Sequence, residues 1–189
     1  MKKYLPILAI IAVVVFVAGC VDSGTNDTPI NTTVPDMPSK TYAKNGISFK
    51  YPVGWTKAAS SNIPGTIVGY GDPESVSKDL TYNTIAIVSK QALPSGSTVK
   101  ESFDATYEQY ANNGTGYDLI SERTLNINGL TAYEKVYNIT VSGVKKEERS
   151  TWFDANGTIY MVLCNALPKD FDSQQTNFDL ITYSFKVTA

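Results

Sequence analysis

Apolar and polar residues alternate along much of the chain beyond residue 46, in short runs that Gly, Pro and Asp interrupt. In GISFKYP, the residues Ile47, Phe49 and Tyr51 fall on one face, and Pro52 ends the run. Trp55 opens a short second run, and GTIVGYGD and NTIAIVSKQ come after it. A period of two indicates strands with one buried face. This part of the chain is therefore predicted to form a β-meander.

A helical period replaces the alternation in STVKESFDATYEQYANNG. Phe103, Tyr107 and Tyr110 are spaced i, i+4 and i+7, which places them in one stripe of a helix. Thr98 and Glu101 stand three residues apart, as in a capping box at a helix start. The segment is predicted to be a helix whose aromatic stripe packs on the sheet, since lining a ligand groove is the less frequent role of such a stripe.

Four longer runs with strand character follow, and a two-residue turn signal separates each from the next. The runs are YDLISERTLNI, LTAYEKVYNITV, KKEERSTWFDA and TIYMVLCNAL, and the turns are Asn-Gly, Ser-Gly and Asn-Gly. Asn-Gly is typical of type I′ hairpins, because both central residues need positive φ. We therefore predict four antiparallel strands in sequence order. In the second run the alternation predicts a helix-packed face with Tyr133, Tyr137, Ile139 and Val141, and a wetter face with Glu134, Asn138 and Thr140.

The last segment, PKDFDSQQTNFDLITYSFKVTA, is predicted to begin as a helix at Pro168, because the first helical turn tolerates a missing N–H. Asp170 and Asp172 suit a helix N-terminus, which favours acidic side chains. An apolar stripe follows, made of Phe171, Phe178 and Ile181. A short strand, SFKV, closes the chain. Two helices and roughly eight strands together predict an α+β domain, an antiparallel sheet covered by helices.

The first 20 residues have the pattern of an export signal: a basic start, an apolar run over residues 5–18, then Gly19 and Cys20. A helix of about 15 residues spans about 22 Å, less than the roughly 30 Å hydrocarbon core, so cleavage is favoured over a membrane-spanning helix. The residues VAGC resemble the lipobox of lipoproteins, and this resemblance implies cleavage before Cys20 and a lipid on its thiol. An uncleaved anchor that ends in an ordinary cysteine is the alternative.

Residues 21–40 are rich in Ser, Thr, Asn and Asp, with three prolines, and are predicted to be a flexible tether. A coil of about 20 residues reaches roughly 25 Å. The predicted organisation is a lipoprotein signal peptide over residues 1–19, a lipidated Cys20 with its tether over residues 20–40, and one domain over residues 41–189. Five N-x-T sequons are possible N-glycosylation sites: Asn26, Asn31, Asn113, Asn138 and Asn156.

Charge and cysteine content narrow the class of function. The formal net charge is −2, and loss of Lys2 and Lys3 with the signal peptide makes it −2 − 2 = −4. A mildly acidic exported domain lacks the positive electrostatic potential that binds phosphate backbones, so a nucleic acid is not expected as a partner. Cys164 has no disulfide partner once Cys20 carries lipid, and it lies in an apolar strand without any histidine in the chain to activate it. It is therefore predicted to be a small buried hydrophobe.

Patterns typical of catalytic or metal sites are missing from the sequence. Zinc or copper would need His or clustered Cys, calcium a D-x-D-x-D-G loop, and phosphate a Gly-rich loop after a strand. No G-x-S-x-G nucleophile motif occurs. The close acidic pairs, Asp72 with Glu74 and Asp170 with Asp172, are predicted to lie in a solvated turn and at a charged helix start. We predict no enzyme activity, no metal and no cofactor.

The order of these segments is similar to that of the PsbP-like family. The similarity rests on NGISFKYPVGWTK, a helix after the early strands, the INGLTAYEKVY hairpin, TWFDANGTIYMVLCNAL and a terminal helix that runs into YSFKV, and it covers nearly all of residues 41–189. It implies an α/β/α sandwich around a central antiparallel sheet, a fold also found in a Ran-binding nuclear import factor and in exported lipoproteins. The motifs are structural, so no catalytic residue and no photosynthetic role are implied. The lipobox and tether look like those of surface PsbP-related lipoproteins of prokaryotes, many of them archaea.

A membrane-anchored accessory or binding domain on the outer face of the cell membrane is the function that these observations favour, with an unidentified protein or membrane complex as partner. The alternative is a surface lipoprotein that binds a small apolar ligand or a glycan in a cleft beside the sheet. Such a carrier needs a continuous apolar pocket of several hundred Å³, whereas a scaffold needs a filled core and an exposed apolar patch. The residues predicted to form a binding site are Tyr51, Trp55, Tyr70 and Asp72.

Overall fold

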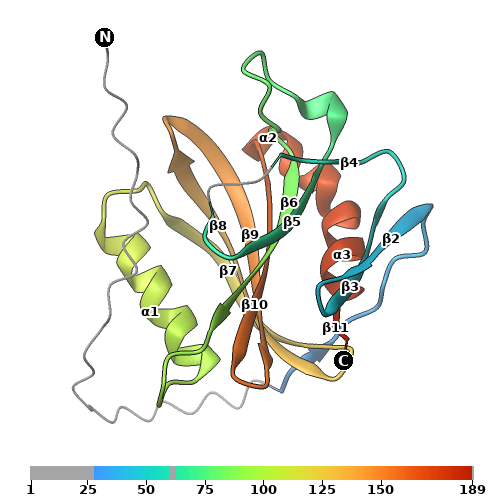
Figure 1. The fold of residues 1–189 in the computed structure, drawn as a ribbon. Coiled ribbons are helices and arrows are strands. Elements are labelled where there is room, and N and C mark those ends of the chain that lie inside the picture. The colour runs from blue at the N-terminus through green and yellow to red at the C-terminus, as the bar shows by residue number, and fades with distance from the viewer. Residues whose placement is uncertain (1–27, 60–62, 189) are drawn as a thin grey trace.

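The computed structural model describes residues 28–59 and 63–188, and its strands form two sheets (Figure 1). The larger sheet has the order β1-β7-β8-β9-β10-β6-β5-β4 and the smaller one β11-β3-β2. The strands are β1 (Ile30–Asn31), β2 (Ser39–Lys44), β3 (Ile47–Pro52), β4 (Thr56–Lys57), β5 (Thr66–Gly71), β6 (Ile85–Ala92), β7 (Asp118–Ile127), β8 (Leu130–Val141), β9 (Val144–Ala155), β10 (Thr158–Ala166) and β11 (Lys186–Val187). The helices are α1 (Val99–Asn112), α2 (Pro168–Phe171) and α3 (Gln175–Tyr183), with 3-10 turns η1 (Pro73–Ser75) and η2 (Asp172–Gln174).

Helices cover both faces of the large sheet (Figure 1). α1 packs on one face, where Phe103 and Tyr107 join a cluster with Trp152. α2, α3 and the small sheet lie over the opposite face, and Phe171 and Phe178 belong to its larger cluster. We call these the α1 face and the α3 face. The predicted α+β class, a sandwich around a mainly antiparallel central sheet, is confirmed.

Turn chemistry sets the central strands. β7 to β10 are the four strands predicted from their turn signals, and they pair antiparallel in sequence order. Asn128, Ser142 and Asn156 have positive φ, and the glycine after each of them does too. These are the backbone conformations that a type I′ turn requires. The register of the centre of the sheet therefore follows from local sequence.

Both predicted helices are confirmed. At the start of α1, the Thr98 Oγ1 accepts the Glu101 N–H at 3.2 Å, and the Glu101 carboxylate accepts the Thr98 N–H at 2.7 Å. This is the capping box that the sequence predicts. The last segment begins its helix at Pro168, although η2 divides it into α2 and α3. Its apolar stripe is fully buried: Phe171, Phe178 and Ile181.

The predicted meander is wrong at its first strand. β3 does not pair with β4; it lies between β2 and β11 in the small sheet. Its antiparallel partner β2 has the sequence SKTYAK, in which Tyr42 is the one large apolar side chain, because β2 is an edge strand with mostly exposed residues. β11 comes from the other end of the chain and pairs Val187 with Ile47. Neither partner leaves a pattern near β3 that local periodicity can detect.

The predicted wetter face of β8 is wrong at Glu134, although Thr140 on that face is exposed. The predicted helix-packed face is wrong at Val141, which is 46% exposed because it stands beside the β8–β9 turn. Tyr137 and Ile139 pack against α1, as expected. Glu134, on the opposite side of the strand, is nevertheless 0% exposed, because it meets Arg149 on the α3 face. A charged residue in a strand usually indicates a solvent-facing side, but Glu134 is one half of a buried ion pair.

Ordered pairing begins upstream of Thr41, within the segment for which a tether is predicted. β1 pairs parallel with β7, with Ile30 beside Leu125 and Asn31 beside Asn126. The Thr32 hydroxyl adds a hydrogen bond of 3.4 Å to the Asn126 carbonyl. The chain then continues to β2, which starts at Ser39. Part of the predicted tether thus forms the edge strand of the large sheet.

Candidate functional site

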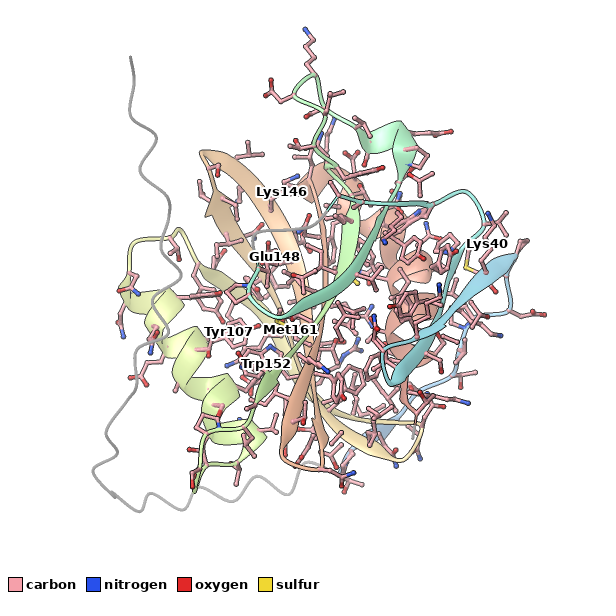
Figure 2. The ribbon with its side chains drawn as sticks, viewed as in Figure 1. Lys40, Tyr107, Lys146, Glu148, Trp152 and Met161 are labelled. Carbon is pink, nitrogen blue, oxygen red and sulfur yellow. The ribbon has the colours of Figure 1, made fainter. Side chains whose placement is uncertain are left out.

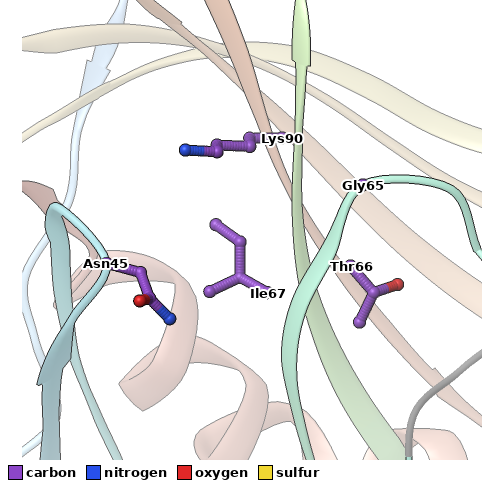
Figure 3. A pocket seen from close by; sticks show the side chains of 5 residues that line it. All are labelled: Asn45, Gly65, Thr66, Ile67 and Lys90. Carbon is purple, nitrogen blue, oxygen red and sulfur yellow. The ribbon is translucent and has the colours of Figure 1, made fainter.

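A groove opens where the β2–β3 turn meets the edge of the large sheet. It has a volume of about 580 Å³ and is lined by Asn45, Gly65, Thr66, Ile67 and Lys90. Asn45 and Gly46 turn the chain with positive φ, and so does Gly65 at the start of β5. Figure 3 shows the Asn45, Ile67 and Lys90 side chains around one common space. Three separate segments, β2–β3, β5 and β6, thus build this site.

Local backbone geometry aims the lining residues. In the pairing of β5 with β6, Thr66 lies opposite Ser89 and Val68 opposite Val88, so that Ile67 is an extra residue at a bulge. A bulge re-aims the side chain that it carries, and here it sends Ile67 toward the groove (Figure 3). The Gly65 carbonyl accepts the Lys90 N–H at 3.0 Å, which holds the start of β5 against β6.

A row of aromatic rings extends from the groove along the seam between the two sheets. The Asn45 side-chain amide donates to the Tyr42 hydroxyl at 2.8 Å. The Tyr42 ring stacks on Phe49 at 5.2 Å between centroids, and Tyr51 stacks on Tyr70 at 3.8 Å. Burial and the hydrogen bond with Tyr51 raise the pKa of Tyr70 to about 12. The Tyr70 hydroxyl therefore stays uncharged at physiological pH.

The structure brings together two of the four predicted binding residues. Tyr51 and Tyr70 form the stacked pair of the seam. Trp55 is 5% exposed and packs edge-on against Phe178 in the core, so it presents little surface to a partner. Asp72 caps η1 by accepting the Glu74 N–H at 3.0 Å. The groove lies further along the seam than the predicted residues.

Sequence reasoning missed Tyr42, Asn45 and Lys90. One signal for them was present, because Asn45-Gly46 in KNGIS is the same turn dipeptide that marks the later hairpins. Reading it would have placed a strand before Asn45 and a hairpin tip at the site. Lys90 carries no such signal, since its approach to Asn45 depends on how the two sheets pack.

The two most buried carboxylates lie on opposite faces of the large sheet, so they do not form a catalytic pair. Glu134 on the α3 face accepts from Arg149 Nε at 2.8 Å and from Arg123 Nε at 2.7 Å. Burial alone would raise the pKa of Glu134, but the charges of Arg149 and Arg123 outweigh it and hold that pKa below its usual value. Glu134 is therefore an ionised partner in a buried network.

Glu148 lies on the α1 face of β9, on the same side of the strand as Lys146 and Trp152 (Figure 2). Its Oε2 accepts the Tyr137 hydroxyl at 2.8 Å. Burial raises the pKa of Glu148, and the Tyr137 hydrogen bond and the Lys146 charge oppose that shift without reversing it. Lys146 itself donates to the Asn83 carbonyl at 3.1 Å, and burial lowers its pKa. This group is a buried acid held among aromatic rings.

Replacing Glu148 by glutamine is expected to raise the free energy of unfolding at pH 8. Because the folded pKa is raised, the contribution of this carboxyl is fully present below its unfolded pKa and is lost as the pH rises through the folded value. Glutamine keeps an acceptor for Tyr137 and removes the buried charge. Urea unfolding of wild type and E148Q at pH 4 and pH 8 measures the difference, with exposed Glu108→Gln as control. A variant less stable than wild type at pH 8 would show that the Lys146 charge outweighs burial.

The acidic pairs predicted to be solvated are not gathered into a metal site. Within residues 28–59 and 63–188, no group of three or more His, Cys, Asp or Glu side chains could hold a metal ion. Asp172 is exposed at the start of η2. Burial, and then the Asp172 charge, raise the pKa of Glu147 on β9. This is a repulsive contact at the surface beside α2, outside the groove.

The two cysteines have separate outcomes. Cys164 is 0% exposed, and burial raises its pKa to about 12, so the prediction of an inert buried residue is confirmed. Cys20 lies outside the described residues, and its lipidation remains a prediction.

Four of the five sequons can be placed, and their use stays a prediction. Asn31, Asn113 and Asn156 are exposed, in β1, after α1 and in the β9–β10 turn. Asn138 lies inside β8, and its Oδ1 is buried without a hydrogen-bond partner. Asn26 lies outside the described residues. Glycan attachment at Asn138 would need its strand to open, whereas the three exposed sites need no such change.

Sequence comparison assigns the chain to a family. A model described as PsbP-like protein matches residues 5–187. The chain belongs to the PsbP-like protein family. No curated protein sequence matches it significantly. The resemblance seen in the strand and turn motifs is thereby confirmed, and this PsbP-like match extends into the apolar leader.

Solved structures show the same fold at low identity. Cyanobacterial PsbP from Synechocystis sp. PCC 6803 is 18% identical, with a TM-score of 0.59, and the match covers 90% of this chain and 98% of that one. LpqN of Mycobacterium tuberculosis, described as involved in cell envelope biogenesis, is 14% identical over 86% and 91% with a TM-score of 0.55. The yeast Ran-binding protein Mog1p is 17% identical over 80% and 96% with a TM-score of 0.54. These likenesses establish the fold of the PsbP-like domain.

Proposed function

We propose that this PsbP-like protein is a lipoprotein held on the outer face of the cell membrane through Cys20, and that its domain is a non-catalytic accessory module that binds a protein partner at the groove. The observation that carries the proposal is the groove itself. It opens to solvent beside the aromatic seam, and polar Asn45 and Lys90 lie across from apolar Ile67. Partner-binding surfaces combine an apolar centre with such a polar rim.

The amino-terminal segment supports export and anchoring. The PsbP-like family match begins at residue 5, inside the apolar run that precedes Cys20. Among the residues that the structure describes, no helix is apolar and long enough to cross a bilayer. We propose attachment through a lipid on Cys20 because the residues VAGC resemble a lipobox.

The shape of the groove favours a protein partner over a small apolar ligand. A small-molecule site buries most of its ligand and is lined mainly by apolar side chains. Of the five residues that line this groove, Ile67 is the one large apolar side chain. Proteins of this fold include one described as Ran-binding and one described as involved in cell envelope biogenesis. At such low identity they support a binding module in general and no particular partner.

Partner capture that depends on the groove tests the proposal. The full chain is expressed in its native host and crosslinked in membranes, as wild type, as the charge reversal Lys90→Glu combined with Ile67→Ser, and as Lys169→Glu. Lys169 is an exposed lysine on α2, away from the groove, and gives a matched charge reversal. We expect the double variant to lose the wild-type partner at least tenfold, a change of about 1.4 kcal/mol in binding, while Lys169→Glu retains it.

Two results would overturn the proposal. Equal recovery of the same partner by all three proteins would exclude the groove as the binding site. Mass spectrometry that finds the mature chain with an unmodified Cys20 thiol would exclude the anchor. A small molecule that copurifies with wild type and is absent from the groove variant would favour the ligand-carrier alternative.

A further inference from the structure

Exposed aliphatic side chains gather at one end of the molecule. Among the described residues, the large apolar side chains that remain exposed are Ile30, Val53, Val76, Leu80, Leu119, Ile120, Val141 and Val144. Leu119, Ile120, Val141 and Val144 lie at strand ends beside the β8–β9 turn, and Val76 and Leu80 lie in the loop between β5 and β6. We call this end of the molecule the hairpin end. Groups of exposed aliphatic side chains on a folded domain often mark a site of contact with a protein or a membrane.

Strand register places these segments together. Val141 pairs with Val144 beside the β8–β9 turn, and the start of β7 lies next to the end of β8. The first residue of β6, Ile85, pairs with the last residue of β5, Gly71, so the loop between β5 and β6 projects from the same end. Figure 1 shows this green loop and the β8–β9 turn at the top of the molecule. The groove lies at the other end of β5 and β6.

The backbone of the loop between β5 and β6 directs the Leu80 side chain into solvent. Leu80 is 84% exposed and has φ +59, a left-handed conformation that is costly for a leucine. The Leu80 N–H donates to the Ser77 carbonyl at 3.0 Å, and the Ser77 N–H donates to the Thr81 carbonyl at 2.8 Å. A hydrogen-bonded turn thus presents an aliphatic side chain at its tip. Strain of this kind marks positions that the surrounding structure over-determines.

The direction of β1 relates this end to the proposed anchor. β1 runs parallel to β7, and β7 runs away from the hairpin end. Within the described residues, β1 therefore points away from the hairpin end. Ten residues separate Cys20 from Ile30, and an extended chain of that length spans at most about 36 Å. From Leu125 back to Leu119 the strand rises about 20 Å. The anchor is thus long enough to reach the hairpin end.

We propose that the hairpin end is a bilayer-contacting surface, in which Leu80, Val141 and Val144 enter the boundary between headgroups and acyl chains. The inference rests on the proposed lipid anchor and adds an orientation to it, with the groove directed away from the membrane. Lysines and acids are mixed at this end, with Lys78 beside Asp79. Contact is therefore driven by aliphatic burial, without need of anionic lipid.

Site-specific labelling of the full lipidated chain tests this orientation. Cys20 carries lipid and Cys164 is fully buried, so a single introduced cysteine can take a fluorophore. The variants are Leu80→Cys and Val141→Cys at the hairpin end and Gln91→Cys, an exposed position near the groove. In phosphatidylcholine vesicles that contain spin-labelled lipid, we expect quenching at positions 80 and 141 at least fivefold above that at position 91. The combined change Val144→Asp and Val141→Asp should lower quenching at Leu80→Cys while the protein stays with the vesicles.

The outcomes separate this inference from the proposed function. A chain that carries lipid and sediments with vesicles, yet is quenched equally at all three positions, overturns the orientation and leaves the anchor intact. Quenching that requires anionic lipid overturns the aliphatic mechanism. If Leu80→Cys without the aspartates shows no quenching and the aspartate variant loses a protein partner, the hairpin end is a protein contact and the bilayer proposal is overturned. Absence of lipid from Cys20 is instead a failure of the proposed function.

Discussion

Replacing Arg149 by methionine is expected to lower the free energy of unfolding by about 3–5 kcal/mol, the usual cost of breaking a buried ion pair. Arg149 is 1% exposed and donates to Glu134 from Nε and to Asp179 from Nη1. Its guanidinium also lies 5.0 Å from the centre of the Tyr183 ring. Removing it leaves Glu134 buried with only Arg123 to balance its charge. Urea or thermal unfolding of the purified domain measures the loss.

Matched variants make this prediction specific. Arg123 binds the same carboxylate but is 40% exposed, so Arg123→Met should cost about 1 kcal/mol, as for a partly solvated pair. The double change Glu134→Leu with Arg149→Met removes both charges and should recover part of the stability. A single Arg149→Met variant no less stable than Arg123→Met would contradict the assignment.

The stabilising effect of Glu134 should also depend on pH. Its folded pKa is lowered by Arg149 and Arg123 against the effect of burial. A carboxyl group whose folded pKa is lowered contributes stability above its unfolded pKa of about 4.5. That contribution is lost as the pH falls through the folded pKa. Stability lost by Glu134→Gln should therefore shrink on acidification below about pH 4.5, the opposite sense to the expectation for Glu148→Gln.

Replacing Gly65 by alanine is expected to destabilise the domain by about 2–5 kcal/mol, through backbone strain and overpacking together. Gly65 has φ +72, and an added Cβ would collide with the Lys90 carbonyl oxygen. That oxygen belongs to backbone and cannot swing aside. The start of β5 would have to move away from β6, which also changes the groove. Partner binding and stability should therefore fall together.

Gly96 supplies the control for this change. It has φ +78, and an added Cβ there meets no atom within 4 Å. Gly96→Ala carries the same conformational strain without the collision and should cost about 1 kcal/mol. Chemical unfolding of both variants gives the comparison. Equal losses would mean that β5 and β6 separate easily at this point, and that the groove is not fixed by Gly65.

Local chemistry explains what could be predicted from the sequence. Asn-Gly and Ser-Gly turns fix the hairpins of β7 to β10, and the capping box at Thr98 fixes the start of α1. The features that escaped prediction depend on pairing between distant residues. β3 joins β11 across Val187 and Ile47, and Glu134 finds Arg149 on the neighbouring strand, facing inward.

Only part of the candidate site could be predicted from the sequence. Tyr51 and Tyr70 could be chosen because aromatic residues flank strand ends near Pro52 and Asp72. Trp55 belongs to the same motif, yet it fills the core, because periodicity alone does not tell which face a short strand buries. The approach of Lys90 to Asn45 depends on how the small sheet is laid over the large one, and no local pattern encodes that.

The buried pair of Glu134 and Arg149 has a consequence for how the chain folds. The two residues lie on neighbouring strands joined by the Ser142–Gly143 turn, 15 positions apart. A slip of one residue would rotate a strand so that its side chains exchange faces. Glu134 or Arg149 would then be buried among the aromatic rings of the α1 face without its oppositely charged partner. The buried ion pair thereby makes a misaligned β8–β9 hairpin less stable than the native register.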